Sequence, residues 1–325
     1  MTSQSVKQPG TSRTPPVTVV IVTYNSRGTI GAALDALRES YDTDLADTVV
    51  VDNASHDGTA DFVAGHAPWA TLVRNAGNVG FGRGCNRGFE LVKTPYALLL
   101  NPDAVIHTDA LLKLVDFMEK SPRTGICGPA VRETSGALQP AGCLPNPWKI
   151  MLRPLLPGWA SRGMRHVVPG ESPAESDWIC GSVMLLRWKM LAEIGWFDPR
   201  FFLYFEETDL CRRARQAGWE IWTVGEAIAE HVNAASAKAT KAPMMADTIS
   251  EHYFQSRFYY LIKHFGWPAA VMAEAGELFL MFARAAAERL RGKKYESLGQ
   301  RLKAPYMKQP SLPGGDDGSG AKQHA

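Results

Sequence analysis

The sequence predicts an α/β fold in which a mostly parallel sheet is flanked by helices, and three features indicate it. The runs Val17 to Thr23 and Thr48 to Val51 are continuously apolar or β-branched, which is typical of strands buried on both faces. Segments with helical spacing separate such runs. This strand–helix alternation favours a doubly wound sheet, and a chain of 325 residues is long enough for one large domain with an appendage.

The first half of the chain repeats this alternation regularly. Ile30, Leu34 and Leu37 give helical spacing to residues 28–39, which lie between the first two strands. The same reasoning predicts the next elements as far as residue 131: helices at 57–66, 83–93 and 109–120, and strands at 70–74, 96–100 and 125–131.

The second half is less regular. Residues 133–176 are rich in Pro, Gly and Trp and predict an irregular loop, which at such a length is usually functional or mobile. A strand is expected at 178–187, a helix at 204–217 and a short last strand at 219–224. From 247 to about 303 the pattern predicts helix, with breaks around Gly266 and Pro268.

Composition divides the chain into four segments: a polar, disordered leader at 1–16, an α/β domain at 17–240, a helical C-terminal extension at 241–304, and a disordered tail at 305–325. The leader lacks the apolar core of a signal peptide. No apolar run approaches the roughly 20 residues of a membrane-spanning helix. Segment 265–283 comes closest, but Glu274 and Glu277 interrupt it.

Charge and cysteine content exclude some classes of function. A net charge of +2 gives no argument for binding nucleic acid. The five cysteines are scattered and contain no C-x-x-C. A reduced cytosolic setting therefore fits better than a disulfide framework or a zinc site.

Two carboxylates follow buried strands, at the edge where open α/β sheets bind ligands. Asp52 ends the second strand, where it can accept from a ribose hydroxyl or a pyrimidine N3–H. Capping the next turn is its alternative role, but Asp57 is available for that. Asp103 follows Tyr96–Leu100 and the rigid Pro102, which suits Mg²⁺ or Mn²⁺ shared with phosphate oxygens; a plain Asx turn is the alternative.

Between these acids lies a glycine-rich segment, Asn75 to Gly88, with Arg83 and Arg87. Glycines let a backbone approach a ligand closely, and positive charge near a helix start suits a diphosphate. After the first strand the chain reads Tyr24 to Gly28, not G-x-G-x-x-G, and no P-loop motif is present. Dinucleotide binding and P-loop chemistry are therefore not expected.

A cluster of acids, Glu206, Glu207 and Asp209, begins the helix expected at 204–217. Crowded negative charge raises at least one pKa, and the aromatic residues before the cluster limit its solvation. A carboxylate of this kind can deprotonate an acceptor hydroxyl opposite a leaving group. The alternative is a solvated acidic first turn, stabilised by the helix dipole.

These segments, taken together, resemble the family 2 inverting glycosyltransferases, and most of all their bacterial rhamnosyltransferase-like branch. The matching motifs occur in the family's order and span about residues 17–233: V-T-Y-N-S (22–26), V-D-N-A-S-x-D-G-T (51–59), N-x-G-F-G-x-G-x-N-x-G (78–88), N-P-D (101–103) and F-E-E-x-D-L (205–210). The resemblance implies the A-type glycosyltransferase fold.

The resemblance also implies residue roles. Glu207 takes the place of the catalytic base, where many relatives have Asp, and Asp103 is the last acid of the D-x-D-type metal motif. His231 matches a histidine that in some relatives completes the metal shell. Donor-binding positions are then Thr23, Tyr24, Asn25, Asp52, Asn53, Gly80, Arg83, Asn86 and Asn101, the last standing in place of the motif's first acid. Acceptor-side positions are Asp177, Trp178, Gly181, Glu206 and Asp209, and Asp209 would also hold the helix start and neighbouring cations.

The function implied is transfer of a sugar from a nucleotide-diphospho-sugar, with L-rhamnose from dTDP-L-rhamnose as the best single choice. The acceptor would be a hydroxyl of a lipid-linked or polysaccharide intermediate in cell-envelope glycan synthesis, with Mg²⁺ or Mn²⁺ as cofactor. A cytoplasmic enzyme, or one peripheral on the inner face of the plasma membrane, is expected, and a homodimer is left open.

Two other functions are alternatives. A nucleotidyltransferase would need a basic Gly-rich signature after the first strand. An inactive sugar-nucleotide-binding module would be favoured by loss of the acid at 103 or 207, and both are present.

Two further segments, one C-terminal and one in the middle of the chain, have two interpretations each. The stripe Val271, Ala275, Leu278, Phe282 and Ala285 precedes a basic end and is typical of a docked helix or of an interfacial membrane helix. Residues 147–165 mix Trp and Leu with Lys and Arg. They could contact a polyprenyl diphosphate at a bilayer, or form a lid.

Overall fold

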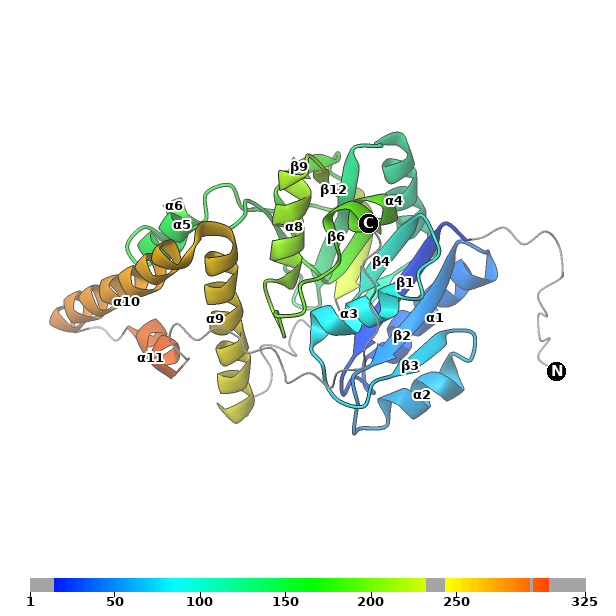
Figure 1. Cartoon of the computed structure of the whole chain (residues 1–325), viewed down its shortest axis with the longest axis horizontal. Coiled ribbons are helices and arrows are strands. Elements are labelled where there is room, and N and C mark those ends of the chain that lie inside the picture. Colours follow the sequence, from blue (N-terminus) through cyan, green and yellow to red (C-terminus); the bar gives the residue numbers. More distant parts are fainter. Residues whose placement is uncertain (1–14, 232–242, 293–294, 304–325) are drawn as a thin grey trace.

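The computed structural model describes residues 15–231, 243–292 and 295–303. The tail expected at 305–325 and nearly all of the leader expected at 1–16 lie outside these ranges. Within them, a nine-stranded sheet has the order β3-β2-β1-β4-β11-β6-β12-β5, with β9 beside β12 (Figure 1). Its strands are β1 (Val17–Thr23), β2 (Ala46–Asp52), β3 (Thr71–Arg74), β4 (Tyr96–Leu100), β5 (Ala104–Ile106), β6 (Thr124–Glu133), β9 (Ala174–Ser176), β11 (Val183–Arg187) and β12 (Glu220–His231).

The block β3-β2-β1-β4 is parallel throughout. Successive residues of β1 enter two different cores: Val19 and Ile21 pack on one face, Val20 and Val22 on the other. This two-sided burial is the physical reason for the continuous β-branched run. Helices cover both faces: α1 (Ile30–Asp42), α2 (Thr59–His66) and α4 (Thr108–Lys120) pack on one, and α3 (Phe81–Phe89), α7 (Trp188–Ile194) and α8 (Glu206–Gln216) on the other. The predicted α/β architecture is confirmed.

The strand expected at 178–187 is interrupted. Trp178–Ile179 forms β10 in a second, small sheet, and Val183–Arg187 forms β11, antiparallel to β4 and β6. Gly181 lies at the break, and a Cβ on it would come within 3.4 Å of the side chain of Glu207. The last strand is longer than expected, since β12 continues to His231 after a register shift between Val224 and Ile228.

Residues 133–176 are more ordered than the predicted irregular loop. They contain β7 (Pro140–Gly142), α5 (Pro147–Leu152), α6 (Pro157–Ala160), β8 (Arg165–His166) and β9. Both short helices begin with proline, whose missing N–H costs nothing at that position. The Asn146 side chain accepts from the Lys149 amide and caps α5. Local capping therefore organises a segment whose composition indicated only turns.

The C-terminal helices lie at the opposite end of the molecule from α1 and α2 (Figure 1). They are α9 (Pro243–Phe265), α10 (Trp267–Leu290) and α11 (Glu296–Lys303). Gly266, with φ of 84°, separates the first two. Helix α10 packs on α5, where a Cβ on Gly276 would lie only 2.6 Å from Met151. None of the helices in the described ranges is long and apolar enough to cross a membrane.

The buried face of α10 is not the predicted apolar stripe. Glu274 and Glu277 are buried there and pair with Arg257 of α9, at 2.8 Å for its Nε and Glu274 Oε1. Arg301 of α11 also contacts Glu274. Phe282 of the stripe is half exposed. Helix α10 therefore docks on α9 and α11, as the docking interpretation predicts, with ion pairs in the contact. Part of its apolar side stays exposed.

Candidate active site

The ends of β1 and β2 bring two unsatisfied polar atoms together. Thr23 and Asp52 are neighbours in the parallel register, and both are buried. Asp52 Oδ2 accepts the Ser55 amide at 3.1 Å. Asp52 Oδ1 and Thr23 Oγ1 are buried without a hydrogen-bond partner among the described residues. An unpaired buried acceptor is costly, and a ligand that brings its own donor would satisfy it. Donor contact by Thr23 and Asp52 stays a prediction.

The neighbouring loops are tied to each other. The Asn25 amide donates to Ser55 Oγ at 2.9 Å, and Asn25 Oδ1 accepts the His56 amide at 2.8 Å. Asn25 has a φ of 53°, which asparagine tolerates better than most residues. Tyr24 is exposed beside it. Asp57 accepts from the Thr59 amide and hydroxyl at the start of α2, and Asp52 Oδ2 holds the turn directly after β2 through the Ser55 amide. Turn capping is therefore one role of Asp52, and contact of its other oxygen with a donor stays a prediction.

Several predicted donor-binding residues in the glycine-rich segment contact protein instead. Asn53 donates to the Gly80 carbonyl at 3.1 Å. Arg83 donates to the Pro199 carbonyl at 2.8 Å, and Asn86 exchanges hydrogen bonds with the Phe197 backbone.

Gly80 has a φ of 87°, and a Cβ there would lie 2.4 Å from the Phe202 carbonyl oxygen. The glycines therefore allow segment 197–202 to approach α3. Donor contact by Asn53, Gly80, Arg83 and Asn86 stays a prediction.

Asp103 and His231 meet although 128 residues separate them. Strand β5, which follows Asp103, pairs with the end of β12. His231 Nε2 lies 2.9 Å from Asp103 Oδ1, and both side chains are nearly buried.

On the other side of the ring, the Gln139 amide lies 3.2 Å from His231 Nδ1, and Gln139 Oε1 accepts from Ser182 Oγ at 2.5 Å. Gln139 thus donates to Nδ1, and Nε2 carries the proton toward Asp103. Sequence reasoning missed Gln139, because it lies in the predicted loop and belongs to no motif.

Segment 181–182 joins this pair to the acidic helix. The Asn101 amide, directly after β4, donates to the Ser182 carbonyl at 2.9 Å. Gly181, the preceding residue, faces Glu207. The structure therefore brings together Asn101, Gly181, Glu207 and, through Ser182, the Asp103–His231 pair.

Glu206 and Glu207 begin α8 but have different surroundings. Glu206 is buried against α3, where its Cβ lies 3.6 Å from the position of a Cβ on Gly82. Burial raises the pKa of Glu206 well above its usual value, and the charge of Glu207 adds to the rise. Burial also raises the pKa of Glu207, while nearby backbone N–H groups oppose the rise. Glu207, whose pKa rises less, is thus the more readily ionised of the two, and its pKa is displaced toward the range of a general base.

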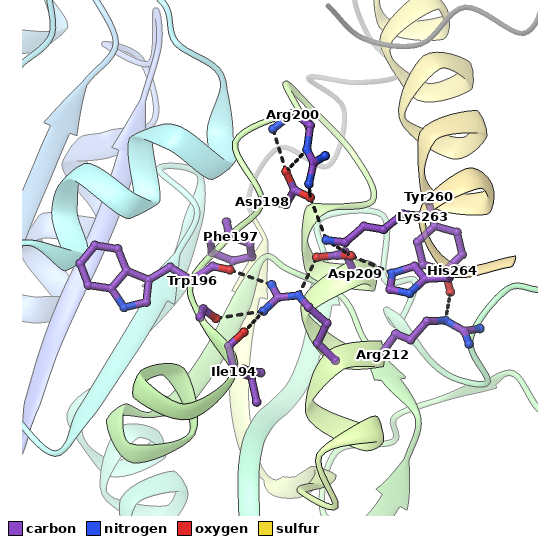
Figure 2. A network of polar contacts seen from close by, with 12 residues as sticks. Ile194, Trp196, Phe197, Asp198, Arg200, Asp209, Arg212, Tyr260, Lys263 and His264 are labelled. Atoms are coloured by element: carbon purple, nitrogen blue, oxygen red, sulfur yellow. Dashed lines mark hydrogen bonds and ion pairs between the residues drawn. The ribbon is translucent and has the colours of Figure 1, made fainter. Parts of the chain in front are cut away.

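Asp209, predicted on the acceptor side, is fully buried among basic side chains. Arg213 lies 2.8 Å from its carboxylate, and Figure 2 shows Lys263 and His264 beside it, at 2.7 Å each. Burial alone would raise the pKa of Asp209, but these partners, His264 first, hold it below its usual value. Lys263 and His264 belong to α9, so Asp209 joins α8 to the C-terminal helices.

One acceptor-side position, Trp178, lies on a cavity of about 320 Å³, whereas Asp177 lines a separate hollow with Arg215. Trp178 and Glu207 line the cavity, together with residues of α5 and α9. Asp177 is half exposed and lies 3.4 Å from Arg215. Contact with an acceptor stays a prediction for each of these residues.

Within the described ranges, no group of three or more His, Cys, Asp or Glu side chains could hold a metal ion. Asp103 and His231 supply two suitable ligand atoms close together. They fit a cation that draws its remaining ligands from a diphosphate and water, as Mg²⁺ commonly does.

Comparison with known proteins agrees with this geometry. Residues 18–161 match the family model described as Glycosyl transferase family 2. The chain is 26% identical over 268 residues to the N-acetylglucosaminyl-diphospho-decaprenol L-rhamnosyltransferase of Mycobacterium tuberculosis, covering 77% of this chain and 85% of that protein. It is 27% identical over 158 residues to Rhamnosyltransferase WbbL of Escherichia coli, covering 44% of this chain and 57% of that one.

Solved structures share the fold. The mannosyltransferase of Pyrobaculum calidifontis in complex with GDP-Man and Mn²⁺ has a TM-score of 0.55 and 18% identity, over 87% of this chain and 77% of that one. TarS of S. aureus in complex with UDP-GlcNAc has a TM-score of 0.53 and 15% identity, over 88% and 78%. The expected resemblance to the family 2 glycosyltransferases is confirmed over residues 18–161, and the chain is similar to bacterial rhamnosyltransferases.

Proposed function

We propose that the protein transfers a sugar, with inversion, from a nucleotide-diphospho-sugar to a hydroxyl of a lipid-linked diphosphate in cell-envelope glycan synthesis. The observation that carries the proposal is the meeting of Glu207 and the Asp103–His231 pair at segment 181–182. Glu207 suits proton removal from an acceptor, and the Asp103–His231 pair suits a donor diphosphate. Both adjoin the same two-residue segment, as a direct displacement between acceptor and donor would require.

The donor we propose is dTDP-L-rhamnose. Asp52 Oδ1, buried and unpartnered among the described residues, would accept the N3–H of the thymine base. Uracil offers the same donor, so the base alone does not select between dTDP and UDP. The choice of rhamnose rests on the two relatives named as rhamnosyltransferases.

In the proposed reaction the acceptor oxygen attacks the anomeric carbon from the face opposite the diphosphate. The new C–O bond forms as the bond from that carbon to the diphosphate oxygen breaks, and the hydroxyl proton passes to a carboxylate oxygen of Glu207. The diphosphate leaves with the electron pair. A single displacement inverts the anomeric centre and needs no covalent intermediate.

Asp103 and His231 are the residues that would hold a divalent cation, Mg²⁺ or Mn²⁺. Such an ion would neutralise charge on the diphosphate. His231 Nε2 carries a proton toward Asp103 in the present arrangement. Ligation through that nitrogen would require the proton to move to Nδ1 and the Gln139 amide to turn and accept it.

The acceptor and location are inferred from two observations. The Mycobacterium tuberculosis relative is named for a decaprenyl-linked diphosphate acceptor. On this chain, α5, α6, the turn between them and α10 expose large apolar side chains: Trp148, Leu155, Leu156, Trp159, Phe279 and Phe282. We therefore place the enzyme on the inner face of the plasma membrane, bound peripherally through these helices.

The test is transfer of labelled sugar to N-acetylglucosaminyl-diphospho-prenol. dTDP-rhamnose, UDP-sugars and GDP-sugars would be compared, each with and without Mn²⁺, and the anomeric configuration of the product determined by NMR. Inverted product from dTDP-rhamnose, dependent on Mn²⁺, is expected. Retained configuration would exclude the single displacement, and a preference for GDP-sugars would exclude the donor.

A further inference from the structure

We infer that the cavity beside Glu207 is the binding site for the diphosphate and first prenyl carbons of a lipid-linked acceptor, with Lys149 and Arg153 as its phosphate-binding residues. The inference rests on the proposed function and deepens it, since neither cation belongs to a motif of the sequence. The walls, the charges and the position of the cavity support it.

The walls of the cavity are largely apolar. Leu144, Ile150, Met164 and Tyr253 line it together with the ring of Trp178. Its volume of about 320 Å³ lies at the lower end of the range for small-molecule sites, roughly 300–1,000 Å³. Such a lining favours a hydrocarbon chain over a free sugar, which would leave its hydroxyls without partners.

Three cations also reach the cavity, and they are not equivalent. Arg257 is buried and bound to Glu274 and Glu277, so its charge is already compensated. Lys149 Nζ contacts the Cys143 sulfur and the Arg162 carbonyl oxygen, each at 2.7 Å, and both partners are neutral. Arg153 is more than half exposed, and its contact with Glu277 is long, at 3.4 Å. Lys149 and Arg153 therefore have charge to offer a diphosphate.

The position of the cavity fits an acceptor rather than a donor. Glu207 forms part of its lining, whereas the nucleotide side, at Asp52 and Thr23, lies at the ends of β1 and β2. The cations come from α5 and the turn after it, so a sugar linked to the diphosphate can extend toward Glu207.

The exposed surface beside the cavity also fits a prenyl chain. Ile150 and Ala160, from α5 and α6, line the cavity. The same two helices expose Trp148 and Trp159. A prenyl chain that leaves the cavity along these helices would pass directly into the surface proposed to face the bilayer.

The experiment uses the full chain and farnesyl diphosphate, a soluble prenyl diphosphate without sugar, as the probe. Binding is measured by isothermal titration calorimetry without nucleotide. The native chain should bind farnesyl diphosphate. Farnesol lacks the diphosphate and inorganic pyrophosphate lacks the prenyl chain, so each should bind at least about 10-fold more weakly. Lys149→Met and Arg153→Gln should each lower the affinity at least about 10-fold, and Lys149→Arg should restore most of it.

The matched control is Arg162→Gln, which removes a neighbouring exposed charge while keeping the carbonyl that Lys149 contacts. It should leave the affinity unchanged, and dTDP affinity should be the same in every variant. Equal farnesyl diphosphate affinity in the native chain and both variants, or no binding at all to the native chain, would overturn the inference. Absence of sugar transfer together with binding that depends on Lys149 and Arg153 would instead count against the proposed reaction and leave the site standing.

Discussion

Glu206 and Glu207 are adjacent, but their directions on the helix differ by about 100°, which gives them separate roles. Glu206 points to α3 and the buried Cys85, and Glu207 points to Gly181 and the cavity. The raised pKa of Glu206 favours its neutral form. A negative charge shared by the pair therefore resides on Glu207, where an acceptor hydroxyl can reach it.

We expect Glu207→Gln to keep donor affinity and to lower turnover at least about 100-fold, the usual contribution of a general base. Glutamine preserves the shape but accepts no proton. Single-turnover transfer, measured alongside dTDP-sugar affinity, checks this. The base would be misplaced by one residue if Glu206→Gln were the inactive variant and Glu207→Gln nearly normal.

The pH dependence of native turnover follows from the raised pKa of Glu207. Since the base must be ionised, activity should rise with pH through a value above the usual 4.5 of a glutamate and then level off. The rise should be absent from whatever activity Glu207→Gln retains. A native profile that is already flat down to pH 4.5 would show that no buried carboxylate limits the rate.

Glu206→Gln should make the protein more stable at neutral pH. A group whose pKa is raised by folding contributes stability below its unfolded pKa and loses that contribution as pH rises through the folded value. Glutamine cannot ionise and avoids the loss, so we expect a gain of about 1–3 kcal/mol at pH 8 that shrinks toward pH 4. Urea unfolding at several pH values tests this. Glu39→Gln, at an exposed position, is the control and should change little; a gain independent of pH would contradict the assignment.

Single residues were predictable from sequence where a strand end or a motif fixed them. Asp52 and Asp103 follow apolar runs, and the structure places both at strand ends. The contact of Gln139 with His231 was not predictable, because it depends on β6 and β12 lying side by side. Arg83 and Asn86 show the converse: their motif indicates a ligand, while their side chains hold the backbone of segment 197–199.

At the scale of elements, α8 and α9 are joined through buried charge. Asp209 of α8 accepts from Arg213 of the same helix and from His264 of α9, and Lys263 bridges Asp209 and Asp198 (Figure 2). Glu207 lies two residues before Asp209 on the same helix. The C-terminal extension therefore helps to fix the helix that carries the proposed base, although its sequence first indicated only docking or membrane contact.

Asp209→Asn should destabilise the protein by about 3–5 kcal/mol, because it removes the buried anion that Arg213 and Lys263 share. The lowered pKa of Asp209 means that the native chain holds this contribution above the unfolded pKa and loses it as pH falls through the folded value. Chemical unfolding at pH 7 and at about pH 2 should show the difference between the two proteins shrinking in strong acid, below the usual pKa of an aspartate. The control is Asp35→Asn, which breaks the exposed pair of Asp35 with His66 and should cost at most about 1 kcal/mol; a similar loss in both variants would contradict the argument.

Elements with regular periodicity were predicted to within a few residues, and the failures have a common cause. The predicted strand at 178–187 divides because Gly181 has to pass Glu207 closely. Segment 133–176 gains order from proline starts and from pairing in the small sheet β10-β7-β8. The close approach at Gly181 and the pairing in the small sheet depend on contacts with distant segments, whereas the proline starts and the Asn146 cap are local. Apolar periodicity encodes neither kind of signal. Glu274 and Glu277, which interrupted an apolar run, turned out to be buried because Arg257 and Arg301 neutralise them.

At the scale of the whole molecule, the two ends have different surfaces. The sheet with α1 and α2 forms one end, and α5, α6 and α10 form the other (Figure 1). Phe279 is 72% exposed and Phe282 50% exposed on α10, and α5 packs against this helix through Met151 and Gly276. If this end meets a bilayer, the cavity beside Glu207 lies close to the membrane while the nucleotide edge of the sheet stays in water.

Replacing Phe279 and Phe282 together by serine should therefore weaken binding to anionic vesicles while leaving transfer to a short-chain, water-soluble acceptor unchanged. Each phenylalanine removed from the interface loses about 1.5–3 kcal/mol of burial, so partitioning should fall at least about 10-fold. Flotation with vesicles containing anionic lipid, at low and high salt, measures this.

Leu112→Ser is the matched control, since Leu112 is 49% exposed on α4, away from these helices, and should not alter flotation. Equal flotation of the native chain and the double variant would mean that the exposed phenylalanines face a protein or solvent. Loss of transfer to the soluble acceptor would mean that they support the cavity rather than the membrane.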